Sequence, residues 1–414
     1  MKALARKIRS LPIALTLSLF SLVLFIFIAL FAPYLANKKP IYIEIGDESW
    51  YPIWEDLKVI KLKNGKNIPC NYTSLRHIEE AYIIWPIATF SPGEANLDGD
   101  PYPPPGTVVN GRTYYLGGTN IGADILAGVI HGARVSLLVG IASMLIALCI
   151  GLFFGIVSAY AGNNMLKASM PEIVIFLLFA LLGWYYAFQV RHFVIVDALK
   201  MGFVQFIAQL LISLAIFLFV CLIGFSLSRL MAKRFSLKRK ALPADHLIGR
   251  FMDFFTSLPR LILLITVSAI AKPSIYTLIL IIGFAGWVGI ARYTRAEVLK
   301  LRNSDFLNAC RIMGMSHRRI VIRHLLPNAL GPALVAFTFG VAGAILSESS
   351  LSYLGIGIPH DITTWGKLLN DARYNFNAWW MVLFPGLAIF ILLLSVNTIG
   401  EYLKEKINPA ISRA

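Results

Sequence analysis

Long apolar runs separated by short polar segments dominate this chain. Seven charge-free runs each meet or approach the ~20 residues that a helix needs to cross ~30 Å of hydrocarbon. These runs are Leu11–Ala36, Val135–Leu166, Ile173–Val190, Met201–Ser228, Pro273–Ala291, Asn328–Ser347 and Tyr374–Gly400. An eighth run, Phe251–Ala271, carries Asp253 and Arg260 in its first half, where both side chains are expected to snorkel to the membrane interface. The pattern predicts an all-α polytopic membrane protein with about eight transmembrane helices.

The first apolar run follows four basic residues, as the apolar part of a signal peptide does. These residues are Lys2, Arg6, Lys7 and Arg9. The run is longer than the roughly 7–15 apolar residues of a signal peptide, and no A-x-A-like cleavage site closes it. We therefore expect a retained membrane anchor.

Charge is distributed in a way that indicates membrane topology. Arg229–Arg250 holds seven Lys/Arg and one acidic residue, and Arg292–Arg323 holds eight Lys/Arg and two acidic residues. Lys38–Arg134, in contrast, holds nine basic and eleven acidic residues. Because basic loops stay in the cytoplasm, both termini and the two basic loops are predicted to be cytoplasmic, with the segment after the first span outside. The net charge of +16 therefore reports topology, and no nucleic-acid partner is expected.

The segment from Asn37 to about Gly122 has the pattern of a small extracytoplasmic insert. Ile41–Ile45 alternates as a strand does, and Pro101–Gly106 is a turn-rich linker. Three tryptophans are expected to supply a small core, namely Trp50, Trp54 and Trp85. Two interpretations stay open, a structural cap or a contact surface for a protein that delivers a solute.

A basic helix-turn-helix is predicted between two apolar runs near residues 292–327. Ser304 is placed to cap a first helix with Asp305 in its first turn. An apolar stripe follows at helical spacing, consisting of Phe306, Ala309, Cys310 and Met313. Gly314 is expected to end this helix in the left-handed C-cap conformation. Ser316 is placed to cap a second helix, which Pro327 is expected to end.

The spacing of this loop resembles the EAA coupling loop of ABC-importer permeases. The residues that carry the resemblance are Asn308, Ala309, Cys310, Gly314, His324, Leu326 and Pro327. The resemblance implies that an ABC ATPase subunit grips this loop. An ordinary basic cytoplasmic loop is the alternative interpretation of the same pattern.

Further segments resemble the oligopeptide and dipeptide branch of that family. Leu116–Leu126 and His131–Leu137, with Gly132 and Arg134, are similar to the segment that leads into its second span, although Gly118 is extra and Asn120 and Ala123 replace the usual Asp and Arg. In physical terms, Asp124 and Arg134 would bracket an amphipathic interfacial helix. Downstream matches are Asp253, Pro259, Glu348, Gly355, Gly357, Trp365, Gly366, Pro385 and Asn397. The insert is most similar to the microcin C and oligopeptide uptake subgroup.

The resemblance implies a type I ABC-importer permease fold with five segments. They are the N-terminal tail with the first span (1–36), the extracytoplasmic insert with the segment leading into the second span (37–134), the second span (135–166), an inserted transmembrane hairpin with a basic loop (167–245), and a permease core (246–414) with the coupling loop at 292–327. The hairpin departs from the family pattern. Because Gly and Ser are sparse in it, we expect it to face lipid.

The chain lacks the motifs that would let it bind ATP or perform catalysis. It has no G-x-x-x-x-G-K-[ST], H-E-x-x-H or G-x-S-x-G sequence, and its histidines and cysteines lack metal-ligand spacing. We therefore expect no cofactor, no metal and no enzymatic activity of its own. Glu348 has two readings, a proton-relay carboxylate or, as the family glutamate at this position favours, a structural hydrogen-bond acceptor.

The resemblance thus implies a multi-pass inner-membrane permease subunit of an importer for peptides or peptide-like solutes. The implied partners are ABC ATPase subunits that bind the ATP, a second permease subunit and an extracytoplasmic substrate-binding protein. A secondary transporter would need intramembrane charges or repeated broken helices, and a membrane-bound enzyme would need a catalytic cluster. A membrane-bound accessory protein, and a permease for nickel or glutathione, are further alternatives.

Overall fold

The structure, a computed structural model, describes most of the chain. The described residues are 12–45, 48–55, 57–61, 67–70, 75, 81–162, 167–235, 240–241, 243–359 and 361–407. The basic residues before the first span, Lys2 to Arg9, lie outside this set. The chain divides into two compact units, one formed by Met1–Ile156 with Phe251–Ala414 and the other by Val157–Arg250.

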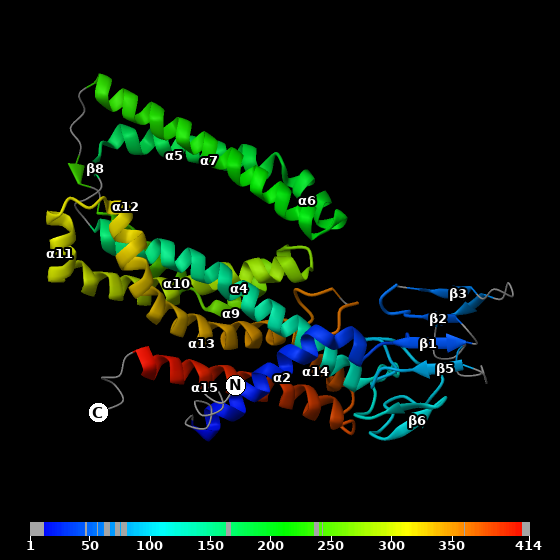
Figure 1. The fold of residues 1–414 in the computed structure, drawn as a ribbon. Coiled ribbons are helices and arrows are strands. Elements are labelled where there is room, and N and C mark those ends of the chain that lie inside the picture. Colours follow the sequence, from blue (N-terminus) through cyan, green and yellow to red (C-terminus); the bar gives the residue numbers. More distant parts are fainter. Residues whose placement is uncertain are drawn as a thin grey trace. The chain divides into compact units, whose positions relative to one another are not determined.

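The first unit is a helical bundle with a small β-rich insert at one end. Its helices are α2 (Ile13–Leu35), α4 (Ile125–Ala161), α8 (Ala244–Ser257), α9 (Arg260–Ile270), α10 (Ile275–Arg302), α11 (Asp305–Ile312), α12 (His317–Ile320), α13 (Leu326–Tyr353), α14 (Trp365–Asp371) and α15 (Trp380–Ile407), of which α4 and α8 continue across the unit boundary. Short helices α11 and α12 and the C-terminal end of α15 lie at one end of this unit, and the strands of the insert lie at the other (Figure 1). The two ends are thus separated by the length of the long helices.

The apolar runs form seven helices long enough to cross a membrane, together with one bent pair, within the part of the chain that the structure describes. The bent pair is α8 and α9, which meet at 81°. Pro259 stands between them as the N-cap of α9, and a proline disfavours helical backbone at the residue before it. The eighth predicted span is therefore a broken helix and not a straight one.

Two contacts show which parts of α10 lie beside the bent pair. On α8, Asp253 forms an ion pair with Arg292 of α10 at 3.2 Å. Beyond α9, the Ser274 N–H donates to the Gly357 carbonyl at 3.0 Å, just after the end of α13. Arg292 and Ser274 are separated by most of the length of α10. The stretch from Asp253 to the end of α9 therefore lies along α10 between Ser274 and Arg292.

The second span starts earlier than predicted. Helix α4 is continuous for 37 residues from Ile125, so the predicted boundary at 134 and 135 falls inside it and no separate interfacial helix precedes it. Asp124 sits just before its first turn, where Oδ2 accepts the Ala127 N–H at 2.8 Å. Burial raises the pKa of Asp124 to about 7. The polar and basic residues near Arg134 do not interrupt the helical backbone hydrogen bonds of α4. The Arg134 side chain is exposed on the outside of this helix.

The insert contains short antiparallel strands. They are β1 (Tyr42–Ile45), β2 (Glu48–Trp50), β3 (Val59–Lys61), β4 (Asn67–Pro69), β5 (Ala81–Ile84), β6 (Thr107–Val109) and β7 (Arg112–Tyr114), arranged as the sheet β2-β1-β5 and the pairs β3-β4 and β6-β7. The expected strand at Ile41–Ile45 is therefore present as β1, within one residue.

Aliphatic residues, not tryptophans, form the core of the insert. Its buried residues are Ile43, Ile60, Cys70 and Leu75. Trp50 and Trp85 pack against them but are only partly buried. The expectation for Trp54 is wrong, because this side chain is 72% exposed and lies against Tyr34 at the end of α2, with 5.6 Å between ring centroids. Branched aliphatic side chains pack closely on the face of a pleated sheet, as Ile43 and Ile60 do here.

The second unit is a helical hairpin closed by two short strands. Its elements are β8 (Lys167–Ala168), α5 (Met170–Trp184), a π-helical turn (Tyr185–Gln189), α6 (His192–Met201), α7 (Phe203–Arg234) and β9 (Lys240–Ala241). The segment between the two charge-free runs of the hairpin is mostly helix α6. Helices α5 and α7 approach closely at Gly224, where an added Cβ would lie 2.4 Å from Cβ of Phe179. Glycine therefore does mark a tight contact here, and the expected position of the hairpin toward lipid stays a prediction.

Pairing of β8 with β9 brings the two ends of the hairpin together, with Lys167 opposite Ala241. Paired residues of antiparallel strands have Cα atoms about 5 Å apart. We therefore predict that replacing residues 167–241 with a four-residue Gly/Ser linker leaves the first unit folded. Size-exclusion chromatography and thermal unfolding in detergent test this, with the full chain carrying the same linker after Ala241 as the control. Aggregation of the deletion variant alone would contradict the division into two units.

Candidate functional site

Helix α11 presents an apolar surface away from the bundle. Leu307 and Cys310 are its buried residues, whereas Phe306, Ile312 and Met313 are 45%, 86% and 67% exposed. Of the predicted apolar stripe of Phe306, Ala309, Cys310 and Met313, only Cys310 is buried. Its apolar members instead belong to an exposed surface that we call the α11 surface, formed by Phe306, Ala309, Ile312 and Met313. Exposed apolar residues that cluster in this way mark interaction sites.

The turn after α11 has the geometry that the glycine predicts. Gly314 has φ +71°. The Gly314 N–H donates to the Arg311 carbonyl at 3.0 Å, and the Met315 N–H donates to the Cys310 carbonyl at 3.1 Å. These two bonds form a Schellman motif, in which glycine occupies the left-handed position. Of the predicted caps, Ser304 and Ser316 stand at the N-cap positions but their side chains make no capping hydrogen bond.

Pro327 does not end the second helix of the loop, contrary to prediction. Helix α12 passes through a π-helical turn, Val321–Leu325, directly into α13, which has Pro327 in its first turn. A proline at that place interrupts no α-helical ladder, because the first N–H groups of a helix have no partner within it. The Asn328 side-chain amide donates to the His324 carbonyl at 2.6 Å. The second helix of the loop and the span thus form one continuous helical rod from His317 to Tyr353.

His324 links the two parts of the loop. Its ring lies edge-on to Phe306 of α11, with centroids 5.2 Å apart and planes at 74°. The neighbouring Leu325 is fully buried, whereas Leu326 is half-buried and Pro327 is exposed. Asn308 and Ala309 are exposed on α11. The structure therefore brings the predicted loop residues into one surface element at the end of α13.

A second group of predicted residues meets at the other end of α13. Trp365 is fully buried, and its Nε1 donates to the Val129 carbonyl of α4 at 2.9 Å. A Cβ on Gly132 would lie 2.4 Å from Trp365 Cδ1, and a Cβ on Gly366 would lie 2.2 Å from the Ser349 carbonyl oxygen. Both glycines are needed for α14 to approach α4 and α13 this closely.

Glu348 lies beside this contact and is completely buried. One of its oxygens accepts hydrogen bonds from Ser136 of α4 at 2.9 Å and Ser349 at 3.3 Å, and the other accepts from Ser352 at 2.9 Å. A buried carboxylate needs such partners to offset its desolvation. These contacts fit the structural reading of Glu348. Ser136, whose hydroxyl joins α4 to α13, was not identified as a site residue from the sequence. The signal that could have identified it is its position in the motif at His131–Leu137.

The remaining predicted residues have separate structural positions. Gly355 has φ +74° and ends α13 in a second Schellman motif, and Gly357 has φ +95°. Pro385 is buried inside α15. Arg134 and Asn397 are exposed on their helices. Among the described residues, no group of three or more His, Cys, Asp or Glu side chains is placed to hold a metal ion.

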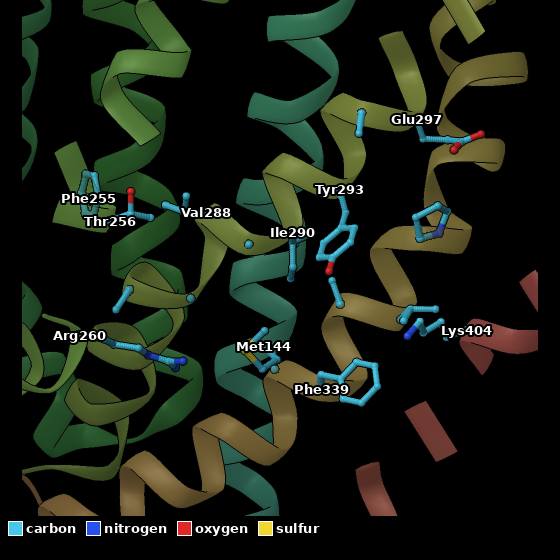
Figure 2. A pocket seen from close by; sticks show the side chains of 18 of the residues that line it. Met144, Phe255, Thr256, Arg260, Val288, Ile290, Tyr293, Glu297, Phe339 and Lys404 are labelled. Atoms are coloured by element: carbon cyan, nitrogen blue, oxygen red, sulfur yellow. The ribbon is translucent and has the colours of Figure 1, made fainter. Parts of the chain in front are cut away.

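A large cavity opens between the helices of the first unit. Its volume is about 1110 Å³, and residues of α8, α9, α10, α13 and α15, with Met144 of α4, line it. Figure 2 shows Arg260 of α9 on one side of this cavity and Glu297 and Lys404 on the other. Most of the lining is apolar, and Phe255, Ile290 and Phe339 contribute to it. The sequence alone assigned none of these residues to a cavity.

Comparison with known proteins identifies the C-terminal part of the chain. Residues 224–413 match the family model described as a binding-protein-dependent transport system inner membrane component. This part of the chain is therefore similar to that permease family. The match covers α8 through α15, and so it contains the α11 surface, the continuous rod and most of the cavity lining.

Individual relatives agree with this assignment. A putative peptide transport system permease protein of Brucella suis is 42% identical over 168 residues, which cover 40% of this chain and 57% of the relative. The di/tripeptide transport system permease protein of Pseudomonas aeruginosa is 27% identical over 313 residues, or 75% of this chain and 77% of the relative. An oligopeptide transport system permease protein of Bacillus subtilis is 30% identical, with 41% and 56% covered. The chain thus spans little more than half the length of the Brucella and Bacillus relatives.

The contact at Gly366 generates a stability prediction. Because even a methyl group would meet the Ser349 carbonyl, Gly366→Ala must displace α14. Overpacking costs about 1–3 kcal/mol, so we expect the midpoint of thermal unfolding in detergent to fall by about 5 °C. Gly386→Ala in α15 is the matched control, since no atom lies within 4 Å of its added Cβ. Equal midpoints for the two variants would show that α14 is not held by this contact.

Proposed function

We propose that this chain is one of two permease subunits of an ATP-driven importer for peptides or peptide-like solutes in the inner membrane. The similar proteins named as peptide, di/tripeptide and oligopeptide permeases support the solute class. The large cavity with a mostly apolar lining supports a transport role for the chain. The ATP would be bound by separate ATPase subunits, and an extracytoplasmic binding protein would deliver the solute.

One observation carries this proposal: Phe306 of the α11 surface packs on His324, which lies in a helical segment that continues without a break into a cavity-lining helix. Helix α12, the π-helical turn and α13 form one rod, and α13 contributes Asn328, Pro332 and Gly340 to the cavity wall. A displacement of α11 and α12 by a partner would therefore move the wall of the cavity. Closure of an ATPase pair on the α11 surface is the movement that we propose.

The composition of the α11 surface fits a protein partner. Exposed apolar side chains at its centre are accompanied by Arg311, Arg318 and Arg319, all exposed. Apolar centres with arginine-rich surroundings are typical of protein interfaces. In this proposal Asn308, Gly314 and Pro327 act through the shape of the loop, and Phe306, Ile312 and Met313 make the contact.

Ile312→Glu tests the contact directly. Because Ile312 is 86% exposed, the substitution leaves the fold unchanged but places an uncompensated charge in a desolvated interface. We expect the yield of ATPase subunits that co-purify with the permease to fall at least about tenfold, equivalent to about 1.4 kcal/mol. Leu97→Glu on the insert, where Leu97 is 79% exposed, is the control and should retain the ATPases. Gly314→Val, which strains the turn at positive φ, should also lose them. Full retention by both Ile312→Glu and Gly314→Val would refute the proposal.

The proposed orientation places the insert outside and the C-terminus in the cytoplasm. Cys70 is buried, so it is unsuitable as a reporter. In a variant with the four native cysteines replaced by alanine, Leu97→Cys should react with a membrane-impermeant thiol reagent in intact spheroplasts. Glu405→Cys, exposed near the end of α15, should react only after lysis. Labelling of Glu405→Cys in intact cells would reverse the proposed topology.

A further inference from the structure

Arg260 lies at the break of the bent pair of helices. It is the first residue of α9, which has 11 residues up to Ile270. At 1.5 Å per residue, about 16 Å of helix separates Arg260 from the end that approaches Gly357. The hydrocarbon core is about 30 Å thick, so this length of helix corresponds to about half of that thickness. The 81° break between α8 and α9 directs the chain inward before this residue.

Arg260 faces the cavity and has room there. Its side chain is exposed and lines the cavity, and Figure 2 shows it reaching toward the other lining residues. On the opposite helix, α13, Gly343 leaves space beside the guanidinium, since a Cβ added there would lie 3.6 Å from Arg260 Nη1. A larger side chain at position 343 would narrow this space. The cation is therefore accessible to a molecule inside the cavity.

Arg260 has no ion pair or hydrogen bond to any side chain in the described part of the chain. Two other cations near the cavity have acidic partners, because Arg292 pairs with Asp253 at 3.2 Å and Lys300 pairs with Glu297 at 3.5 Å. Lys404 belongs to the last turn of α15, at the end of the bundle that carries α11. A charged side chain in the middle of a membrane is costly and is retained where it has a function.

We propose that Arg260 binds a carboxylate of the transported solute inside the cavity. A guanidinium is planar and matches a carboxylate with two parallel hydrogen bonds. The lining beside it is apolar, with Met144, Leu263 and Phe339. A short peptide with a free C-terminal carboxylate has the matching chemistry, an anionic end and a body that tolerates apolar surroundings. This proposal rests on the proposed function, because it assigns a residue to the solute that the importer carries.

Binding to the membrane complex without its extracytoplasmic binding protein tests the proposal, because recognition by that protein is then excluded. The complex of permeases and ATPases is purified from the native host, and equilibrium dialysis measures the binding of radiolabelled trialanine and of its C-terminal amide. We expect the wild-type complex to bind the free acid about tenfold more tightly than the amide. Arg260→Met should abolish this preference, and Arg260→Lys should keep part of it. Lys300→Met, which removes a paired cation of the same cavity, should keep all of it.

Each remaining outcome has a distinct meaning. A preference for the free acid that survives in Arg260→Met would overturn the proposal. Loss of the second permease subunit from the Arg260→Met complex would also overturn it, because Arg260 would then pair with that subunit. Failure of the wild-type complex to bind either peptide, with the ATPases still attached, would contradict the peptide specificity of the proposed function. Loss of preference in an intact complex with normal basal ATP hydrolysis would support the assignment of Arg260.

Discussion

The close approach of α14 to α4 and α13 is the contact on which the architecture of the first unit depends. Two glycines make it sterically possible, because Gly366 meets the backbone of Ser349 and Gly132 meets the ring of Trp365. The buried carboxylate of Glu348 then gains hydroxyl donors from both α4 and α13. In a membrane, where the hydrophobic effect does not drive helices together, small residues and buried hydrogen bonds provide the association. This end of the bundle thereby holds α13 in place.

Helix α13 connects that anchored end to the α11 surface at the other end. Its continuity through the π-helical turn Val321–Leu325 matters because a flexible loop there would absorb any displacement of α11 and α12. The π-helical turn also explains how Pro327 is tolerated within a longer helical rod. Helix α13 lines the cavity between the two ends, so a force on the α11 surface has a direct structural route to the wall of the cavity.

The broken span contributes a different property to the same cavity. A straight helix through Asp253 and Arg260 would have placed both charges on one rod near the interface. The break at Pro259 instead leaves Asp253 paired with Arg292 and brings Arg260 to the cavity wall. In the proposed role, an accessible guanidinium in a mostly apolar cavity would distinguish solutes by their charge as well as by their size. The same segment therefore combines a structural ion pair with a candidate recognition residue.

The sequence by itself determined the spans, the turn at Gly314 and the resemblance to a permease, because these depend on local properties of the chain. Apolar runs of sufficient length predict helices in a membrane, and a glycine after an apolar helix predicts a left-handed C-cap. Only the tertiary structure decided which side of α11 is buried. Helical periodicity marks apolar positions, but it does not distinguish Leu307 and Cys310, which pack on the bundle, from Phe306 and Met313, which face outward. The surroundings of Arg260 were equally beyond the sequence, because they result from an 81° bend and from Gly343, which lies 83 residues farther along the chain.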